Sequence, residues 1–287
     1  MSALGSTSHT CRPMFEHVAQ RRFSSIAKQF FPDNTNELPM ALHCNQGVIT
    51  GSAALYVLMG RFYEKPRDLN IIVTQGKLTE MEEWLNSVGY EETNNEEVHV
   101  GLSLFILDFK IFWAQSNIIT LAESMGPDIM EIIIHSPTTT DMTFITAGGV
   151  ATLYPNWTLN DANVISPTGE WEQHGGGKIG SVNAGRGNIY KDNAFMNEAC
   201  GPVCPGLWRN VRTDTNLMVV DWDWRYSARG HAVTTGSLQN SVQPLGKRGC
   251  LHQCTTFAIE RGTSHATTQH SDPDAKGCYT PPRAQNL

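Results

Sequence analysis

The chain has 287 residues, 40% of them hydrophobic, which is enough for one good core and a small second one. Its formal net charge is -7, with a pI near 5.8 and no long basic run, so we expect no broad binding of nucleic acid, because an acidic surface does not attract a phosphate backbone. No apolar stretch approaches the roughly 20 residues of a membrane span. The N-terminus also lacks the charged and apolar regions of a secretory signal, so we expect an intracellular protein with no membrane partner.

The first predicted elements alternate between helix and strand. Residues 1–13 are small and polar, and we expect them to be disordered. Apolar residues at helical spacing then predict a helix over residues 14–31, which a polar loop follows. Residues 47–50 predict a short buried strand, and residues 53–59 predict a helix directly after it. Residues 68–73 predict a second strand, in which Leu69, Ile71 and Val73 recur at every second position and point together into the core.

The alternation continues through the middle of the chain. Residues 78–88 carry one apolar helical face, which predicts another helix. Residues 98–114 have the composition of one or two strands, and residues 118–121 favour one more. Residues 128–135 fit a strand or a helix, because so short an apolar run cannot distinguish them, and short apolar pieces follow up to residue 154. The chain is therefore predicted to be a mixed α/β protein.

The composition changes after residue 165. We expect one folded domain over residues 14–165 and a partly ordered C-terminal extension over residues 166–227, which includes an apolar run at residues 217–220. Residues 228–287 are mostly Gly, Ser, Thr, His, Gln and Pro. We expect this tail to be disordered, because it cannot bury enough apolar surface to offset its chain entropy.

The strand at residues 68–73 carries the first residues that point to a chemistry. Side chains alternate between the two faces of a strand, so Asp68 and Asn70 share one face. Two acids at this spacing can hold magnesium ions and, through them, the phosphates of a nucleotide. Gly51 and Ser52 start the preceding helix, where backbone N–H groups and the positive end of the helix attract phosphate. A plain turn with Ser52 as the helix N-cap remains an alternative interpretation.

Taken together, these residues resemble a known signature. Thr50-Gly51-Ser52, a helix and then residues 66–73 are similar to the Gly-Ser and Asp-x-Asp/Glu signature of the nucleotidyltransferase superfamily, most of all its divergent intracellular members in mushroom-forming fungi. Shorter stretches at residues 117–121, 141–146, 153–155 and 200–209 add to the resemblance. It implies a small mixed sheet flanked by helices and the transfer of a nucleoside monophosphate from a triphosphate to a hydroxyl or amine, with two magnesium ions. It also implies that Gly51 and Ser52 contact the phosphates and that Asp68 is the first metal ligand.

The chain departs from the family pattern at Asn70, where the family has a second acid. An asparagine oxygen can coordinate a hard cation, but it brings no negative charge, so metal binding should be considerably weaker. Asp108, on an expected strand, and Glu123, just past another, are candidates for a third acid, although neither stands in an obvious family pattern. We therefore expect the transferase activity to be weakened or lost.

Other polar clusters have plainer explanations. Cys200 and Cys204, together with Cys250 and Cys254, could supply four thiolates to a structural zinc ion. We favour reduced thiols, because zinc pairs more often have two intervening residues and the second pair lies in the expected disordered tail. The glycine-rich segment at residues 174–178 lacks the Gly-Lys-Ser/Thr ending of a phosphate-binding loop, so we interpret it as a flexible loop.

Two hypotheses follow from the sequence. The first is a nucleotidyltransferase-like protein that binds a magnesium–nucleoside triphosphate through Gly51, Ser52 and Asp68. The second is a non-catalytic interaction or structural domain on the same fold, which Asn70 favours. No element of the sequence identifies an acceptor substrate or a protein partner.

Overall fold

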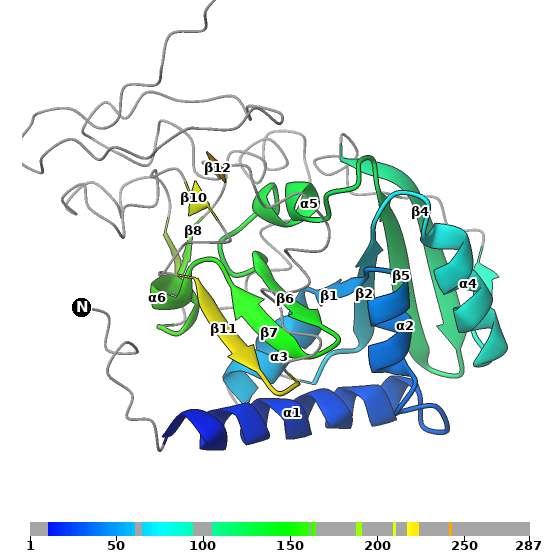
Figure 1. Ribbon diagram of the computed structural model, residues 1–287, viewed down its shortest axis with the longest axis horizontal. Helices are drawn as coiled ribbons and strands as arrows, with labels where there is room; N and C mark the ends of the chain where they lie inside the picture. The colour runs from blue at the N-terminus through cyan, green and yellow to red at the C-terminus, as the bar shows by residue number, and fades with distance from the viewer. Residues whose placement is uncertain are drawn as a thin grey trace, which may run out of the picture.

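The computed structural model describes residues 11–60, 65–93, 105–160 and 217–223, together with four short strands. Those four strands form two small sheets, in which β8 (Ala162–Val164) pairs with β9 (Asn188–Tyr190) and β10 (Arg209–Asn210) pairs with β12 (Ser241–Val242). The remaining described residues form helices around an eight-stranded sheet (Figure 1). None of the described helices combines the length and the apolar character that crossing a membrane requires.

The large sheet is mixed, which confirms the predicted α/β class. Its strands lie in the order β11 (Met218–Asp221), β7 (Gly149–Thr152), β6 (Thr143–Thr146), β1 (Val48–Thr50), β2 (Asp68–Val73), β5 (Asn117–Ser124), β4 (Ile106–Ala114) and β3 (Glu91–Thr93). Neighbouring strands are antiparallel except for β2 and β5, which are parallel. A parallel pair requires a long crossover, and the connection between β2 and β5 contains the helix α4 (Leu78–Ser87).

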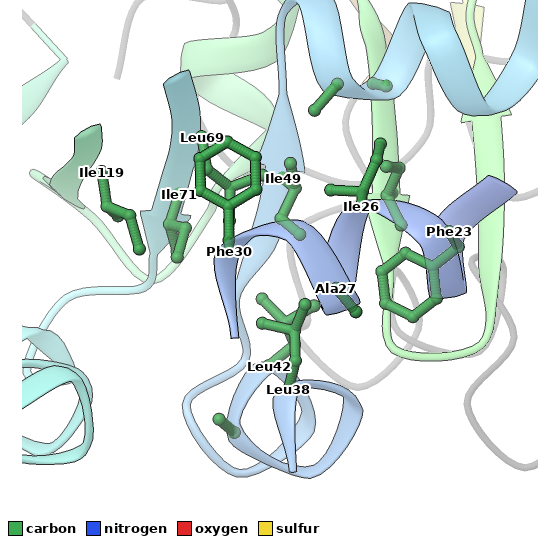
Figure 2. Packing of buried hydrophobic residues seen from close by; sticks show 14 of the residues in the cluster. Phe23, Ile26, Ala27, Phe30, Leu38, Leu42, Ile49, Leu69, Ile71 and Ile119 are labelled. Atoms are coloured by element: carbon green, nitrogen blue, oxygen red, sulfur yellow. The ribbon is translucent and has the colours of Figure 1, made fainter. Parts of the chain in front are cut away.

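The larger core lies between one face of the sheet and the helices α1 (Cys11–Phe30), α2 (Leu38–Cys44), α3 (Ser52–Met59) and α4. Figure 2 shows Phe23, Ile26 and Phe30 of α1 together with Leu38 and Leu42 of α2. They pack against four side chains of the central strands, Ile49, Leu69, Ile71 and Ile119. Burying one such side chain contributes about 1.5–3 kcal/mol, so this layer fixes the positions of β1, β2 and β5.

The second face of the sheet is covered over part of its length. Val48, Ile72, Ala122 and Phe144 point to this face and pack against the short helix α5 (Met130–Ile134). In Figure 1, α5 lies at the top and α1 runs along the bottom, with the sheet between them. Of the ambiguous residues 128–135, Met130–Ile134 form this helix, and just before it the backbone N–H of Met130 donates a hydrogen bond of 2.8 Å to a carboxylate oxygen of Asp128.

The structure corrects several predicted boundaries. Helix α1 begins at Cys11 instead of residue 14, so residues 11–13, which were predicted to be disordered, belong to the helix. Strand β11, which lies within the predicted C-terminal extension, pairs with β7 at the edge of the large sheet. Trp222, just after β11, stacks on Phe23 of α1 with ring centroids 5.2 Å apart. Strand β12 lies within the tail predicted to be disordered. Helix α2, after the predicted polar loop, was not expected.

His135 ends α5 and should make the stability depend on pH. Its Nδ1–H donates a hydrogen bond of 2.7 Å to the Glu131 carbonyl, and its ring stacks on Phe105 with centroids 4.0 Å apart. Burial lowers the pKa of His135, although the Glu131 carbonyl opposes this. The folded state therefore binds the proton less readily than the unfolded state does. The contribution of neutral His135 to the free energy of unfolding is fully present above the ordinary histidine pKa of about 6.5 and is lost as the pH falls below it.

The substitution His135→Phe tests this dependence, because it keeps an aromatic ring beside Phe105 but removes the titrating group. Urea unfolding from about pH 7.5 to about pH 5.5 should show a steeper loss of stability in the parent than in the variant. Equal slopes in the two proteins would contradict this account of His135.

Candidate functional site

The end of β1 and the start of β2 bring the predicted polar residues together. Thr50 of β1 pairs with Asn70 of β2, and Asn70 pairs in turn with Thr120 of β5. These three side chains and Asp68 lie on the face of the sheet that α1 to α4 do not cover, and all are partly exposed. Farther along the same face, Ile72 is buried in the second core. The polar residues therefore occupy the open part of this face.

Asn70 is the centre of a hydrogen-bonded network. Its amide Nδ2 donates to the Asp68 carboxylate over 3.1 Å, and its Oδ1 accepts a hydrogen bond of 2.7 Å from the Thr120 hydroxyl. The orientation of the amide follows from chemistry, because an ionised carboxylate only accepts hydrogen bonds. An aspartate at position 70 would lack the donor and would bring a second negative charge to Asp68. In this geometry the asparagine supplies a neutral donor to the remaining acid.

Gly51 forms the turn between β1 and α3, and its backbone conformation explains why a glycine stands at this position. Its φ of 71° and ψ of -145° lie in a region that residues with a side chain almost never occupy. A Cβ at this position would also lie 2.8 Å from Nδ2 of Asn70. The turn is therefore packed directly against the polar network, and a side chain at position 51 would disturb both.

Helix α3 starts at Ser52, and Gly51 is its N-cap, without a side-chain capping hydrogen bond. The alternative interpretation of Ser52 as the N-cap is therefore wrong. Gly51 and Ser52 are partly exposed, whereas Ala53 is buried. The first amides of a helix have no intrahelical acceptor, so the start of α3 beside Asn70 can donate hydrogen bonds to an anion.

Asp108 and Glu123 do not join this site. They face each other across β4 and β5, and both side chains point to the opposite face of the sheet, the face that α4 covers. Glu123 is buried and accepts a hydrogen bond from the Gly76 amide. Asp108 is exposed and accepts a hydrogen bond of 2.7 Å from the Phe109 amide. The structure therefore separates both candidate third acids from Asp68 and Asn70.

The residue on β5 that does reach Asn70 is Thr120, which the sequence analysis did not select. One signal was present, because Thr120 is a polar residue between Ile119 and Leu121, whose side chains both face the core. The parallel pairing of β2 and β5 brings it opposite Asn70, and a local pattern does not reveal that pairing. The side chain that β5 brings to Asn70 therefore ends in a hydroxyl, which carries no charge.

Asp68 is the one carboxylate among the residues of this network. Among the described residues, no three His, Cys, Asp or Glu side chains gather into a metal-binding group. Asn70 turns its amide N–H toward Asp68 and its oxygen toward the Thr120 hydroxyl, so the Asn70 oxygen does not point to the same place as the carboxylate. Magnesium commonly uses one or two protein carboxylates together with substrate phosphates and water, so Asp68 is the residue here that could hold an ion carried by phosphates. The four cysteines considered for zinc, Cys200, Cys204, Cys250 and Cys254, lie outside the described residues, as does the glycine-rich loop.

Comparisons with known proteins found no match for this chain. No protein-family model matches the chain. No curated protein and no solved structure matches it either. The resemblance to nucleotidyltransferases therefore depends on the motif residues alone.

Proposed function

We propose that this chain is a nucleotidyltransferase-like protein that binds a magnesium–nucleoside triphosphate through Gly51, Ser52 and Asp68, with its transferase activity weakened or lost. The observation that carries the proposal is the contact between the Gly51 turn and Asn70, which sets the start of α3 beside the Asp68 carboxylate. The order of the elements supports it, because β1, β2 and β5 are adjacent and are connected through α3 and α4. The described sheet is mixed and flanked by helices, as the resemblance implies, but with eight strands it is larger than the small sheet expected.

The geometry suggests a division of roles in binding. The amides at the start of α3 and the positive end of its dipole favour the negative phosphate oxygens. Gly51 has no side chain, so the phosphates can approach the backbone closely. Asp68 would bind the magnesium ion that the phosphates carry, and the ion would neutralise part of their charge. Binding of this kind needs only one protein carboxylate.

Transfer chemistry needs more than the site contains. A two-metal mechanism uses both ions to stabilise the attacking and the leaving oxygen, and each ion requires anionic ligands. Here Asn70 and Thr120 are neutral where further carboxylates would be needed, and Asp108 and Glu123 lie on the other face. A second magnesium ion would therefore be held weakly, which favours nucleotide binding over catalysis.

Thermal unfolding tests the proposal. A ligand present at about 100 times its Kd stabilises the folded protein by about 2.7 kcal/mol, so magnesium with a bound nucleoside triphosphate should raise the Tm by several degrees. Each of the four common nucleoside triphosphates is to be tried, with magnesium and with manganese. Asp68→Ala should abolish the rise.

Asp108→Ala is the matched control for that measurement. It also removes an accessible carboxylate from the sheet, but from the opposite face, so the ligand-dependent rise should persist. A rise that survives in Asp68→Ala, or that both variants lose equally, would contradict the proposed site.

A non-catalytic interaction domain is the second candidate. The observation in its favour is that Asp68, Asn70 and Thr120 already satisfy one another by hydrogen bonds without any ligand. This candidate predicts no change in Tm with any nucleotide, in the parent or in either variant.

A further inference from the structure

Trp113 is unusually accessible for a tryptophan in a strand, and it lies on the same face as the proposed site. Its side chain is 44% exposed, whereas large aromatic side chains are usually well buried. Trp113 of β4 pairs with Ile118 of β5, and Ile118 pairs with Asp68 of β2. The three residues therefore form one row across three neighbouring strands. Because strands are about 4.8 Å apart, the row extends about 10 Å from Asp68 to Trp113.

We propose that Trp113, with Ile118 beside it, is the surface on which the base of the bound nucleotide stacks. This inference rests on the proposed function, because it assumes that the phosphates bind at Gly51, Ser52 and Asp68. The ribose then spans the row above the partly exposed Ile118. A base is planar and largely apolar on its faces, so a tryptophan ring provides a favourable contact area.

The charges along the row fix the orientation of the nucleotide. On the far side of Trp113, its partner on β3 is the exposed carboxylate of Glu91. Each end of the row has one carboxylate, but only the Asp68 end also has a helix start, where α3 carries the positive end of its dipole. A triphosphate that carries magnesium is therefore favoured at the Asp68 end, where the carboxylate binds the ion, and is disfavoured beside Glu91. The neutral base is the part of the nucleotide that suits the position between Glu91 and Ile118.

Stacking of this kind supplies affinity without choosing among bases. Every base has a π-face, so a tryptophan accepts purines and pyrimidines alike. The larger rings of the purines overlap more of the indole, so we expect at most a modestly higher affinity for purine nucleotides than for pyrimidine nucleotides.

The test compares two probes that share a triphosphate chain, of which only one carries a nucleoside. Magnesium with adenosine triphosphate contacts both ends of the row, whereas magnesium with inorganic tripolyphosphate contacts only the phosphate end. In Trp113→Ala the Kd for adenosine triphosphate should rise by about 5- to 100-fold, and the Kd for tripolyphosphate should stay at the parent value. Trp113→Phe keeps a stacking ring and should remain close to the parent for both probes.

Leu107→Ala is the matched control, because Leu107 is a 51% exposed apolar residue on the same strand and lies about 20 Å from Trp113 by strand spacing. Circular dichroism melting of each variant establishes that it is folded. If both probes bind the parent and Trp113→Ala weakens neither, or weakens both equally, the stacking role is overturned while the phosphate site stands. If neither probe binds the parent, the proposed function fails, and the stacking role fails with it.

Discussion

Asn70→Asp should destabilise the metal-free protein by about 1–3 kcal/mol and should make its stability respond strongly to magnesium. The substitution removes the amide that donates to Asp68 over 3.1 Å and sets a second carboxylate in its place. Two unit charges about 4 Å apart interact by about 4 kcal/mol near a protein surface, and the partial exposure of both side chains reduces that value. A magnesium ion between the two acids reverses the sign of the effect, because it is attracted to both.

Urea unfolding with and without magnesium measures both parts of this prediction. Asn70→Ala is the control, since it removes the same donor without adding charge and should gain nothing from magnesium. An Asn70→Asp protein as stable as the parent and indifferent to magnesium would show that positions 68 and 70 do not act together.

Gly51→Ala should cost about 2–4 kcal/mol, through two separate effects. The backbone conformation at φ 71° and ψ -145° is strained for alanine, and the new Cβ would lie 2.8 Å from Nδ2 of Asn70. Relief of that contact requires Asn70 to move, which breaks its hydrogen bonds to Asp68 and Thr120. The variant should therefore lose nucleotide binding as well as stability.

Gly76→Ala separates the two effects. Gly76 also has a positive φ, of 80°, but a Cβ there would meet no atom within 4 Å, so only the backbone strain of about 1–2 kcal/mol applies. In the double variant Gly51→Ala with Asn70→Ala, the contact is gone, and the combined cost should be smaller than the sum of the single costs. Urea unfolding of the parent, of the three single variants Gly51→Ala, Gly76→Ala and Asn70→Ala, and of the double variant measures these costs. A cost of Gly51→Ala no larger than that of Gly76→Ala would contradict the account.

The elements that the sequence predicted correctly are those with a strong local period. The strand β2 has apolar residues at every second position, Leu69, Ile71 and Val73, and its bounds match the prediction. The position of the four-residue strand β11 was harder to predict. It pairs with β7, and no local signal in the sequence specifies a partner strand so distant along the chain. Its apolar character was visible, but its membership of the large sheet was not.

The site was predictable only in part, for a similar reason. The shared face of Asp68 and Asn70 follows from the strand period alone. The faces of Asp108 and Glu123 depend on the strand register, and β4 has an irregularity between Ile106 and Asp108 that shifts it. The contact from Thr120 depends on which strand lies beside β2. Strand order and register are properties of the whole sheet, so a local pattern could not supply them.

The most direct test of the central claim is a calorimetric titration of magnesium–nucleoside triphosphate into the parent and into Asp68→Asn. This substitution keeps the shape of the side chain and an oxygen that can accept from Asn70, but it removes the charge that the proposal assigns to metal binding. The account predicts binding at one site in the parent and a Kd at least about tenfold higher in the variant, which corresponds to about 1.4 kcal/mol. Equal affinity in the two proteins, or no binding heat in the parent with any of the four nucleotides, would contradict it.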